Sequence, residues 1–293
     1  MDNLQTELPI QTKIKQRTRP NGQLLKWIGN KYKYANDIVA FLPKDFNQYI
    51  EPFIGTGAIL ATLSPAKGIA GDTLTPLIDM WNTLKTSPEV LINHYEETIN
   101  RFNEDRKGVY AEVVDRYNAN PNPEDLVIIS RTCYGGVMRF RTDGHISTPI
   151  GPHKPIAPIS FKARALEHHS RIQNTIFLNE SFSETMKHAN NGDVVYCDPP
   201  YIDSQKILYG AQKFDFKDLI DEIAKCKSRG VKIALSIDGA KKSGKKKIEI
   251  EVPPDLFERE VLLDCGSSML KRFQNGGAAM IGEDVHDRLL LTW

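Results

Sequence analysis

The 293-residue sequence is poor in cysteine and has no segment suited to a membrane or a secretory signal. Its four cysteines, Cys133, Cys197, Cys226 and Cys265, lie far apart and form no C-x-x-C pair, so neither a disulfide framework nor a zinc knuckle is indicated. No apolar run approaches the roughly 18 residues of a transmembrane helix, and the polar N-terminus lacks the apolar stretch of a signal peptide. These absences predict a cytoplasmic protein with reduced thiols.

A strong overall charge is also lacking, because the net charge is only +1. Basic residues nevertheless gather between 131 and 171, where the only acids are Asp143 and Glu167. The basic residues of this segment, histidines aside, are Arg131, Arg139, Arg141, Lys154, Lys162, Arg164 and Arg171. Such a segment in a near-neutral chain suits a phosphate-binding face, although an ordinary solvated surface has the same composition.

Hydrophobic periodicity predicts an α/β fold. Short runs rich in β-branched and aromatic residues alternate with amphipathic segments, as in an open, mostly parallel, doubly wound sheet. The predicted strands are Tyr49–Phe53, Gly68–Asp72, Thr175–Asn179, Asp193–Cys197, Val231–Ile237, Arg259–Asp264 and Arg288–Trp293. The helices predicted between several of them include Lys31–Phe41, Leu77–Lys85 and Phe216–Ser228.

This alternation is interrupted between about residues 86 and 172. Three helices are predicted first, at Val90–Phe102, Arg106–Tyr117 and Glu124–Arg131, and a Gly- and Pro-rich stretch to Pro158 then contains the hairpin-like turn Arg-Thr-Asp-Gly-His. We therefore expect a flexible tail at 1–22, a main domain formed by 23–85 and 173–293, and an inserted domain at 86–172.

A glycine-rich turn after the first predicted strand favours a nucleotide-like ligand. Gly55 and Gly57 allow a sharp turn into a helix whose N-terminus faces the ligand, although a plain strand–helix turn can have the same pattern. Asp72 ends the next strand, where a carboxylate can accept hydrogen bonds from both ribose hydroxyls. The chain lacks the third glycine of the dinucleotide pattern and any G-x-x-x-x-G-K-[ST] loop, so a nucleoside without a pyrophosphate is favoured.

The segment from Asp193 to Tyr201 indicates the chemistry. A buried strand ends in Asp198-Pro199-Pro200-Tyr201, and consecutive prolines fix the backbone while their carbonyls stay available. The amino nitrogen of adenine is a poor nucleophile because its lone pair is delocalised into the ring. The Asp198 carboxylate and the Pro199 carbonyl can accept its two N–H groups and turn the lone pair toward a methyl donor, while Tyr201 can stack on the base.

These segments, in this order, resemble the Dam-like class of DNA adenine-N6 methyltransferases over about residues 24–293. Leu25–Lys31 is similar to the K-W-x-G-G-K motif of that class, with Asn30 in place of the second glycine, and Glu51–Ala58 is similar to E-P-F-x-G-x-G. Asp198–Tyr201 reads D-P-P-Y, and Cys133–Gly151 resembles the DNA-contacting hairpin. The resemblance implies a Rossmann-like methyltransferase sheet with an inserted helical and β-hairpin target-recognition domain.

The same resemblance implies S-adenosylmethionine as the methyl donor, no metal, and a specific set of residues. The implied catalytic residues are Asp198, Pro199, Pro200 and Tyr201. The implied cofactor-binding residues are Trp27, Lys31, Glu51, Phe53, Gly55, Gly57, Asp72 and Asp198. The implied DNA contacts are Arg139, Arg141, His145 and Ser147.

We therefore predict methylation of an adenine flipped out of duplex DNA. Two alternatives stay open: an N-methyltransferase acting on RNA or on a protein glutamine, and a DNA-binding homologue that has lost activity. The long basic insertion favours DNA as the substrate, and the intact Asp198–Tyr201 motif argues against lost activity. A separate cognate restriction endonuclease is a candidate partner, and a monomer is the default expectation.

Overall fold

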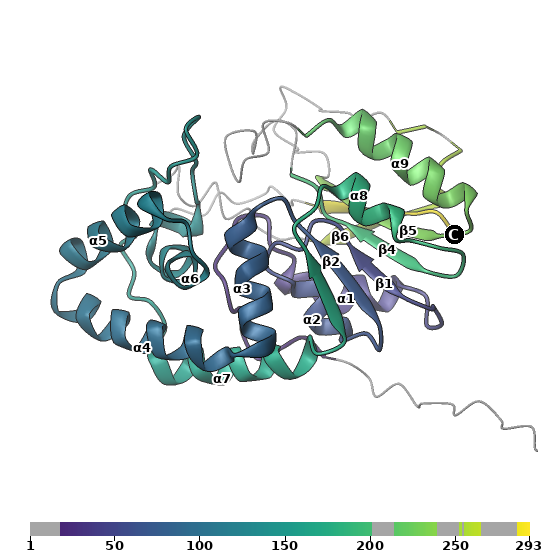
Figure 1. Cartoon of the computed structure of the whole chain (residues 1–293). Helices are drawn as coiled ribbons and strands as arrows, with labels where there is room; N and C mark the ends of the chain where they lie inside the picture. Colours follow the sequence, from purple (N-terminus) through teal and green to yellow (C-terminus); the bar gives the residue numbers. More distant parts are fainter. Residues whose placement is uncertain (1–17, 201–213, 239–251, 254, 265–285) are drawn as a thin grey trace, which may run out of the picture.

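The computed structural model describes residues 18–200, 214–238, 252, 253, 255–264 and 286–293, and within them the chain forms a seven-stranded sheet with the order β3-β2-β1-β4-β5-β7-β6 (Figure 1). Pairing is parallel from β3 to β5, and β7 runs antiparallel to both of its neighbours. The predicted open, mostly parallel α/β fold is confirmed.

All seven predicted strands are present, with ends that differ by a residue or two. The strands are β1 (Tyr49–Glu51), β2 (Gly68–Gly71), β3 (Thr175–Leu178), β4 (Val194–Cys197), β5 (Lys232–Asp238), β6 (Arg259–Asp264) and β7 (His286–Leu291). The central strands β1, β2 and β4 are buried at every position, which is why they read in the sequence as continuous apolar runs rather than as alternating patterns.

The predicted helices are also present, including the one expected after the glycine turn, except that the predicted helix Lys31–Phe41 is a 3₁₀ turn at Tyr32–Tyr34 followed by an α-helix from Ala35. Two more helices, α7 and α8, were not indicated by the periodicity. The α-helices are α1 (Ala35–Phe41), α2 (Ala58–Leu63), α3 (Thr75–Thr86), α4 (Pro88–Glu104), α5 (Arg106–Ala119), α6 (Pro123–Thr132), α7 (Pro158–Arg171), α8 (Phe182–Lys187) and α9 (Phe216–Ser228). Two short 3₁₀ turns, η1 (Tyr32–Tyr34) and η2 (Tyr134–Gly136), complete the described helical elements. None of the helices in these ranges combines the length and apolar character needed to cross a bilayer.

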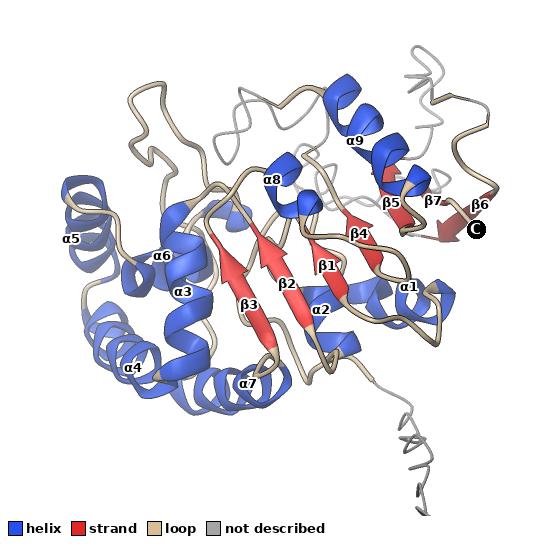
Figure 2. Ribbon diagram, turned by 45° about the vertical axis from the view of Figure 1, so that its right-hand side comes forward, coloured by secondary structure: helices blue, strands red, loops and turns tan. Residues whose placement is uncertain are grey.

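Helices cover both faces of the sheet (Figure 2), and a separate hydrophobic cluster lies on each face. On one side, alternate strand residues such as Ile50 and Val195 pack against α8 and α9. On the other side, neighbouring residues such as Tyr49 and Tyr196 belong to a larger core that includes α1, α2, α3 and α7. The alternation of side chains along each strand thus supplies both layers from one sheet.

The inserted helices extend this larger core. Leu91 of α4, Tyr117 of α5 and Ile129 of α6 belong to the same buried cluster as Tyr49 of the sheet. In both views α4, α5 and α6 stand beside the β3 edge (Figures 1 and 2). In the described structure, therefore, the insertion at 86–172 shares its core with the sheet, and its assignment as a recognition domain stays a prediction.

The last residues of the predicted N-terminal tail make hydrogen bonds with the body of the protein. The amide N–H of Arg19 donates to Asn36 Oδ1 at 2.8 Å, that of Asn21 to Glu167 Oε2 at 2.8 Å, and that of Gly22 to the Tyr32 hydroxyl at 2.7 Å. Residues 1–17 lie outside the described residues. The prediction of a tail reaching residue 22 is therefore too long at its C-terminal end.

Candidate active site

A cavity of about 330 Å³ opens where the order of the parallel strands reverses, between the carboxyl ends of β1 and β4. Ligands of open α/β sheets bind at this kind of switch point. We call this cavity the main pocket. Its lining residues are Trp27, Ile28, Gly29, Asn30, Lys31, Glu51, Pro52, Phe53, Ile54, Gly55, Thr56, Ala58, Ile59, Asp72, Thr73, Ser181, Phe182, Tyr196, Asp198, Pro199, Pro200 and Phe214.

Asp72 lies at one end of the main pocket, as the sequence predicted. Its Oδ1 accepts the N–H of Leu74 at 3.0 Å, and its Oδ2 is 3.5 Å from the N–H of Gly55. Burial raises the pKa of Asp72 to about 6, against the lowering effect of these amides. The carboxylate is therefore held rigidly but is short of hydrogen-bond donors, which suits a ligand that brings hydroxyl groups.

The two glycines of the turn have different surroundings. Gly55 lines the main pocket with φ of +45°, and a Cβ added there would meet no protein atom within 4 Å. Gly57 has φ of +60°, and its Cβ would come within 2.8 Å of the Trp81 ring. Gly57 is not among the lining residues. Gly55 therefore faces the main pocket, whereas Gly57 faces the Trp81 side chain.

Glu51 ends β1, and its buried side chain lines the main pocket. Its Oε2 accepts a hydrogen bond from the Tyr49 hydroxyl at 2.7 Å. Burial raises the pKa of Glu51 to about 8, the Tyr49 hydroxyl opposes this, and the nearby Asp198 carboxylate adds to it. A cationic group that enters the pocket would stabilise the ionised form of Glu51 and lower this pKa.

Aromatic side chains form one wall of the main pocket. Phe53 stacks on Phe182, with ring centroids 5.4 Å apart, and the Phe214 ring meets both of them edge-on. Trp27 and Phe53 were expected here, whereas Phe182 and Phe214 were not. Phe182 begins α8 shortly after β3 ends. Its place after the carboxyl end of a parallel strand was therefore the signal that could have assigned it to the pocket. This wall suits a planar, heteroaromatic ligand group.

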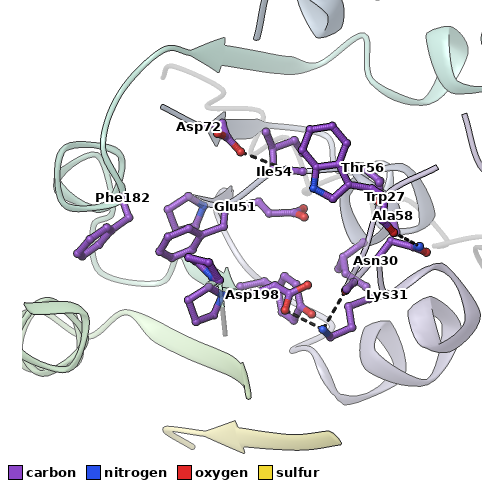
Figure 3. A pocket seen from close by; sticks show the side chains of 18 of the residues that line it. Trp27, Asn30, Lys31, Glu51, Ile54, Thr56, Ala58, Asp72, Phe182 and Asp198 are labelled. Atoms are coloured by element: carbon purple, nitrogen blue, oxygen red, sulfur yellow. Dashed lines mark hydrogen bonds and ion pairs between the residues drawn. The ribbon is translucent and has the colours of Figure 1, made fainter. Parts of the chain in front are cut away.

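Asp198 and Lys31 face each other at the opposite end of the main pocket (Figure 3). Lys31 Nζ lies 2.8 Å from Asp198 Oδ1 and donates to the Gly29 carbonyl at 3.1 Å. Burial raises the pKa of Asp198, and the Lys31 ammonium opposes that shift. Pro199 and Pro200 line the pocket next to Asp198, while Tyr201, the fourth predicted catalytic residue, lies outside the described residues.

The four predicted DNA contacts share one face of the hairpin between α6 and α7. The bridges Cys133–Ile150 and Phe140–Ile146 join its two arms. Arg139, Arg141, His145 and Ser147 are exposed, whereas the residues alternating with them, Met138, Phe140, Ile146 and Thr148, are buried. Arg141 forms an ion pair with Asp143 at 3.2 Å. The hairpin therefore presents polar and basic side chains outward on an apolar base.

No group of three or more possible metal ligands occurs among the residues that the structure describes. The chemical groups that line the main pocket include carboxylates, the Lys31 ammonium group and aromatic rings. This combination suits an organic ligand with a ribose, a cationic group and a planar ring.

The fold and this pocket define the chain as a Rossmann-like methyltransferase. Residues 27–252 match the family model of the D12 class N6 adenine-specific DNA methyltransferases, and the chain belongs to this family. It is therefore an adenine-specific DNA methyltransferase.

Three relatives illustrate this membership. The DNA adenine methylase of Vibrio cholerae is 28% identical over 72% of this chain and 79% of its own length. The DNA adenine methylase of Escherichia coli strain K12 is 28% identical over 62% of this chain and 66% of its own length. The type II methyltransferase M1.LlaDCHI of Lactococcus lactis subsp. cremoris is 27% identical over 72% of this chain and 79% of its own length.

Proposed function

We propose that this protein transfers a methyl group from S-adenosylmethionine to the amino nitrogen of an adenine flipped out of duplex DNA, with Asp198 as the central acceptor. The observation that carries this proposal is the position of Asp198, which lies in the main pocket beside two prolines and opposite the Asp72 end. A bound nucleoside cofactor and an inserted base would then meet in one cavity.

The main pocket fits S-adenosylmethionine at each of its chemical groups. Asp72 can accept the ribose hydroxyls, and Phe182 and Phe53 can pack on the adenine ring. Glu51 can pair with the α-ammonium group, which would draw its pKa back down. When bound, the cofactor supplies a methyl group activated by a sulfonium charge.

Asp198 and the Pro199 carbonyl orient the target nitrogen. Each can accept one N–H of the adenine amino group, which favours a tetrahedral nitrogen whose lone pair points at the methyl donor. The two consecutive prolines restrict the backbone that holds these acceptors. The residues therefore act chiefly by orientation, and the proton released after transfer can leave through Asp198.

The hairpin is the proposed DNA contact. Arg139 and Arg141 can reach phosphates or base edges, and His145 and Ser147 lie on the same exposed face. Extrusion of the adenine costs a few kcal/mol of unstacking, which contacts of this kind can offset. A cognate restriction endonuclease is a further proposed partner, since one relative is named a type II methyltransferase.

The test is methyl transfer with defined acceptors. Purified protein is incubated with radiolabelled S-adenosylmethionine and unmethylated duplex DNA, and the nucleosides are then analysed for N6-methyladenine. RNA and a protein extract serve as the competing acceptors. Asp198→Ala is expected to abolish transfer, whereas Asp221→Ala, which removes an exposed acid paired with Lys217 on α9, is expected to leave it intact. Label in RNA or protein alone would refute the proposed substrate.

A further inference from the structure

Lys31 lies between two carboxylates rather than one. Its Nζ is 2.8 Å from Asp198 Oδ1 at the end of β4 and 3.6 Å from Asp287 Oδ2 on β7. All three side chains are largely withdrawn from solvent, with exposed fractions of 3% for Lys31, 17% for Asp198 and 11% for Asp287. Asp287 is not among the residues that line the main pocket.

This arrangement affects the role proposed for Asp198. A carboxylate that is paired with an ammonium group at 2.8 Å has part of its hydrogen-bonding capacity in use. The ammonium also neutralises part of the carboxylate charge, so Asp198 accepts the adenine amino group most strongly when its contact with Lys31 lengthens. A buried ammonium group that loses its counter-ion is strongly destabilised, so Lys31 needs another anion within reach.

We propose that Asp287 is a positioning residue that receives the Lys31 ammonium when Asp198 turns to the target adenine. The inference rests on the proposed function, because it assumes that Asp198 accepts the amino group. Asp287 is suited to this role because its carboxylate is already within 4 Å of Lys31 Nζ yet stays outside the pocket lining. A small movement of the lysine side chain exchanges the shorter contact for the longer one.

The charges around Asp198 fit this exchange. Burial has the largest effect on the pKa of Asp198 and raises it. The Lys31 ammonium lowers this pKa, and the Asp287 carboxylate raises it. Asp198 in turn contributes to the raised pKa of Glu51 on β1 and of Tyr196 on β4. Removing the charge of Asp287 should therefore have two opposite effects: Asp198 ionises more easily, but Lys31 stays attached to it.

The variant Asp287→Asn tests the proposal with the full-length protein. We expect kcat to fall roughly tenfold, on the scale of one hydrogen bond to a charged group, while the KM for S-adenosylmethionine stays unchanged. The acidic limb of the kcat pH profile should move to lower pH, because a like charge next to Asp198 is gone. A purely structural loss would lower the active fraction without moving this limb.

A variant that lacks the lysine tests whether the effect of Asp287 depends on Lys31. In Lys31→Gln protein there is no ammonium group to exchange, so adding Asp287→Asn should cause no further loss of kcat. Asp287→Glu keeps a carboxylate and should keep wild-type kcat. The matched control is Arg288→Gln on the same strand, whose side chain pairs with Glu260 at 2.7 Å away from the pocket, and whose kcat should equal that of the wild type.

The outcomes separate the two proposals. Wild-type protein that transfers no methyl group to DNA would overturn the proposed function and, with it, the role of Asp287. Active wild-type protein with an unchanged kcat and pH profile in Asp287→Asn would overturn only the counter-ion role. An equal loss of kcat on Asp287→Asn substitution with and without Lys31 would also overturn only that role.

Discussion

The turn after β1 allows the binding and folding roles of its two glycines to be separated by alanine substitution. Both residues have positive φ, +45° at Gly55 and +60° at Gly57, where a side chain costs roughly 1–2 kcal/mol. Gly55→Ala adds only this strain, because its Cβ would meet no protein atom within 4 Å. Its methyl group would instead occupy part of the main pocket.

Gly57→Ala adds a steric clash to the same strain. Its Cβ would lie 2.8 Å from the Trp81 ring, which cannot retreat easily. Trp81 is fully buried, stacks on Phe177 with centroids 5.7 Å apart, and donates from Nε1 to the Gly55 carbonyl at 3.2 Å. Overpacking of this kind costs roughly 1–3 kcal/mol, so the total loss in the free energy of unfolding should be about 2–5 kcal/mol.

Two measurements check this pair. Urea unfolding should show Gly57→Ala to be the less stable variant, and calorimetric titration with S-adenosylmethionine should show the larger loss of affinity in Gly55→Ala. Wild-type protein measured under the same conditions is the reference. Equal stability of the two variants, or an unchanged affinity in Gly55→Ala, would refute the roles assigned to the two glycines.

Three further predictions concern the charged residues. Asp198→Asn should lower kcat by roughly 10²–10³, since it keeps one acceptor oxygen but removes the negative charge aimed at the reacting amino group. Titration should show that S-adenosylmethionine still binds, and a kcat near that of the wild type would contradict this. Burial raises the pKa of Asp72 from 3.8 to about 6, so the folded state loses stability as the pH rises through that window. Asp72→Asn should therefore raise the free energy of unfolding by about 1–3 kcal/mol at pH 8, and this gain should shrink below pH 6. The same variant should bind the cofactor more weakly. Urea unfolding at several pH values tests the stability change. Arg139→Ala should weaken DNA binding and reduce the slope of log K against log salt concentration by about one. Arg141→Ala should reduce both less, because Asp143 at 3.2 Å partly neutralises Arg141. Equal slopes for the two variants would argue against this ranking.

Local sequence patterns predicted the strands and the pocket residues at their ends, because the determinants of these features are local; the family resemblance implied Trp27, Lys31, Glu51 and Phe53 in addition. A continuous apolar run such as Val194–Cys197 followed by Asp198 and two prolines predicts both a buried strand and the acid at its end. Gly55 and Asp72 could be placed in the same way, from strand ends that meet at one edge of a parallel sheet.

The features missed in the sequence depend on packing between distant segments. Asp287 reaches Lys31 only because β7 inserts between β5 and β6, and no spacing in the chain indicates that order. Gly57 was grouped with Gly55 by its motif, yet its surroundings are set by Trp81 of α3. Phe214 contributes to the aromatic wall from the residues just before α9, far from the other members of that wall in the sequence.

The core shared by α4, α5, α6 and the sheet affects how the recognised DNA sequence can be re-engineered. Exchanging the whole insertion at 86–172 with that of another methyltransferase would cut through one continuous hydrophobic cluster. The hairpin belongs to the same cluster through Met138, Phe140 and Ile146, and Asn118 of α5 bonds both the N–H and the carbonyl of Ile146. If the hairpin contacts DNA as proposed, a change of specificity is best confined to its exposed residues Arg139, Arg141, His145 and Ser147, because these substitutions leave the shared cluster and the scaffold around Asp198 and Lys31 intact.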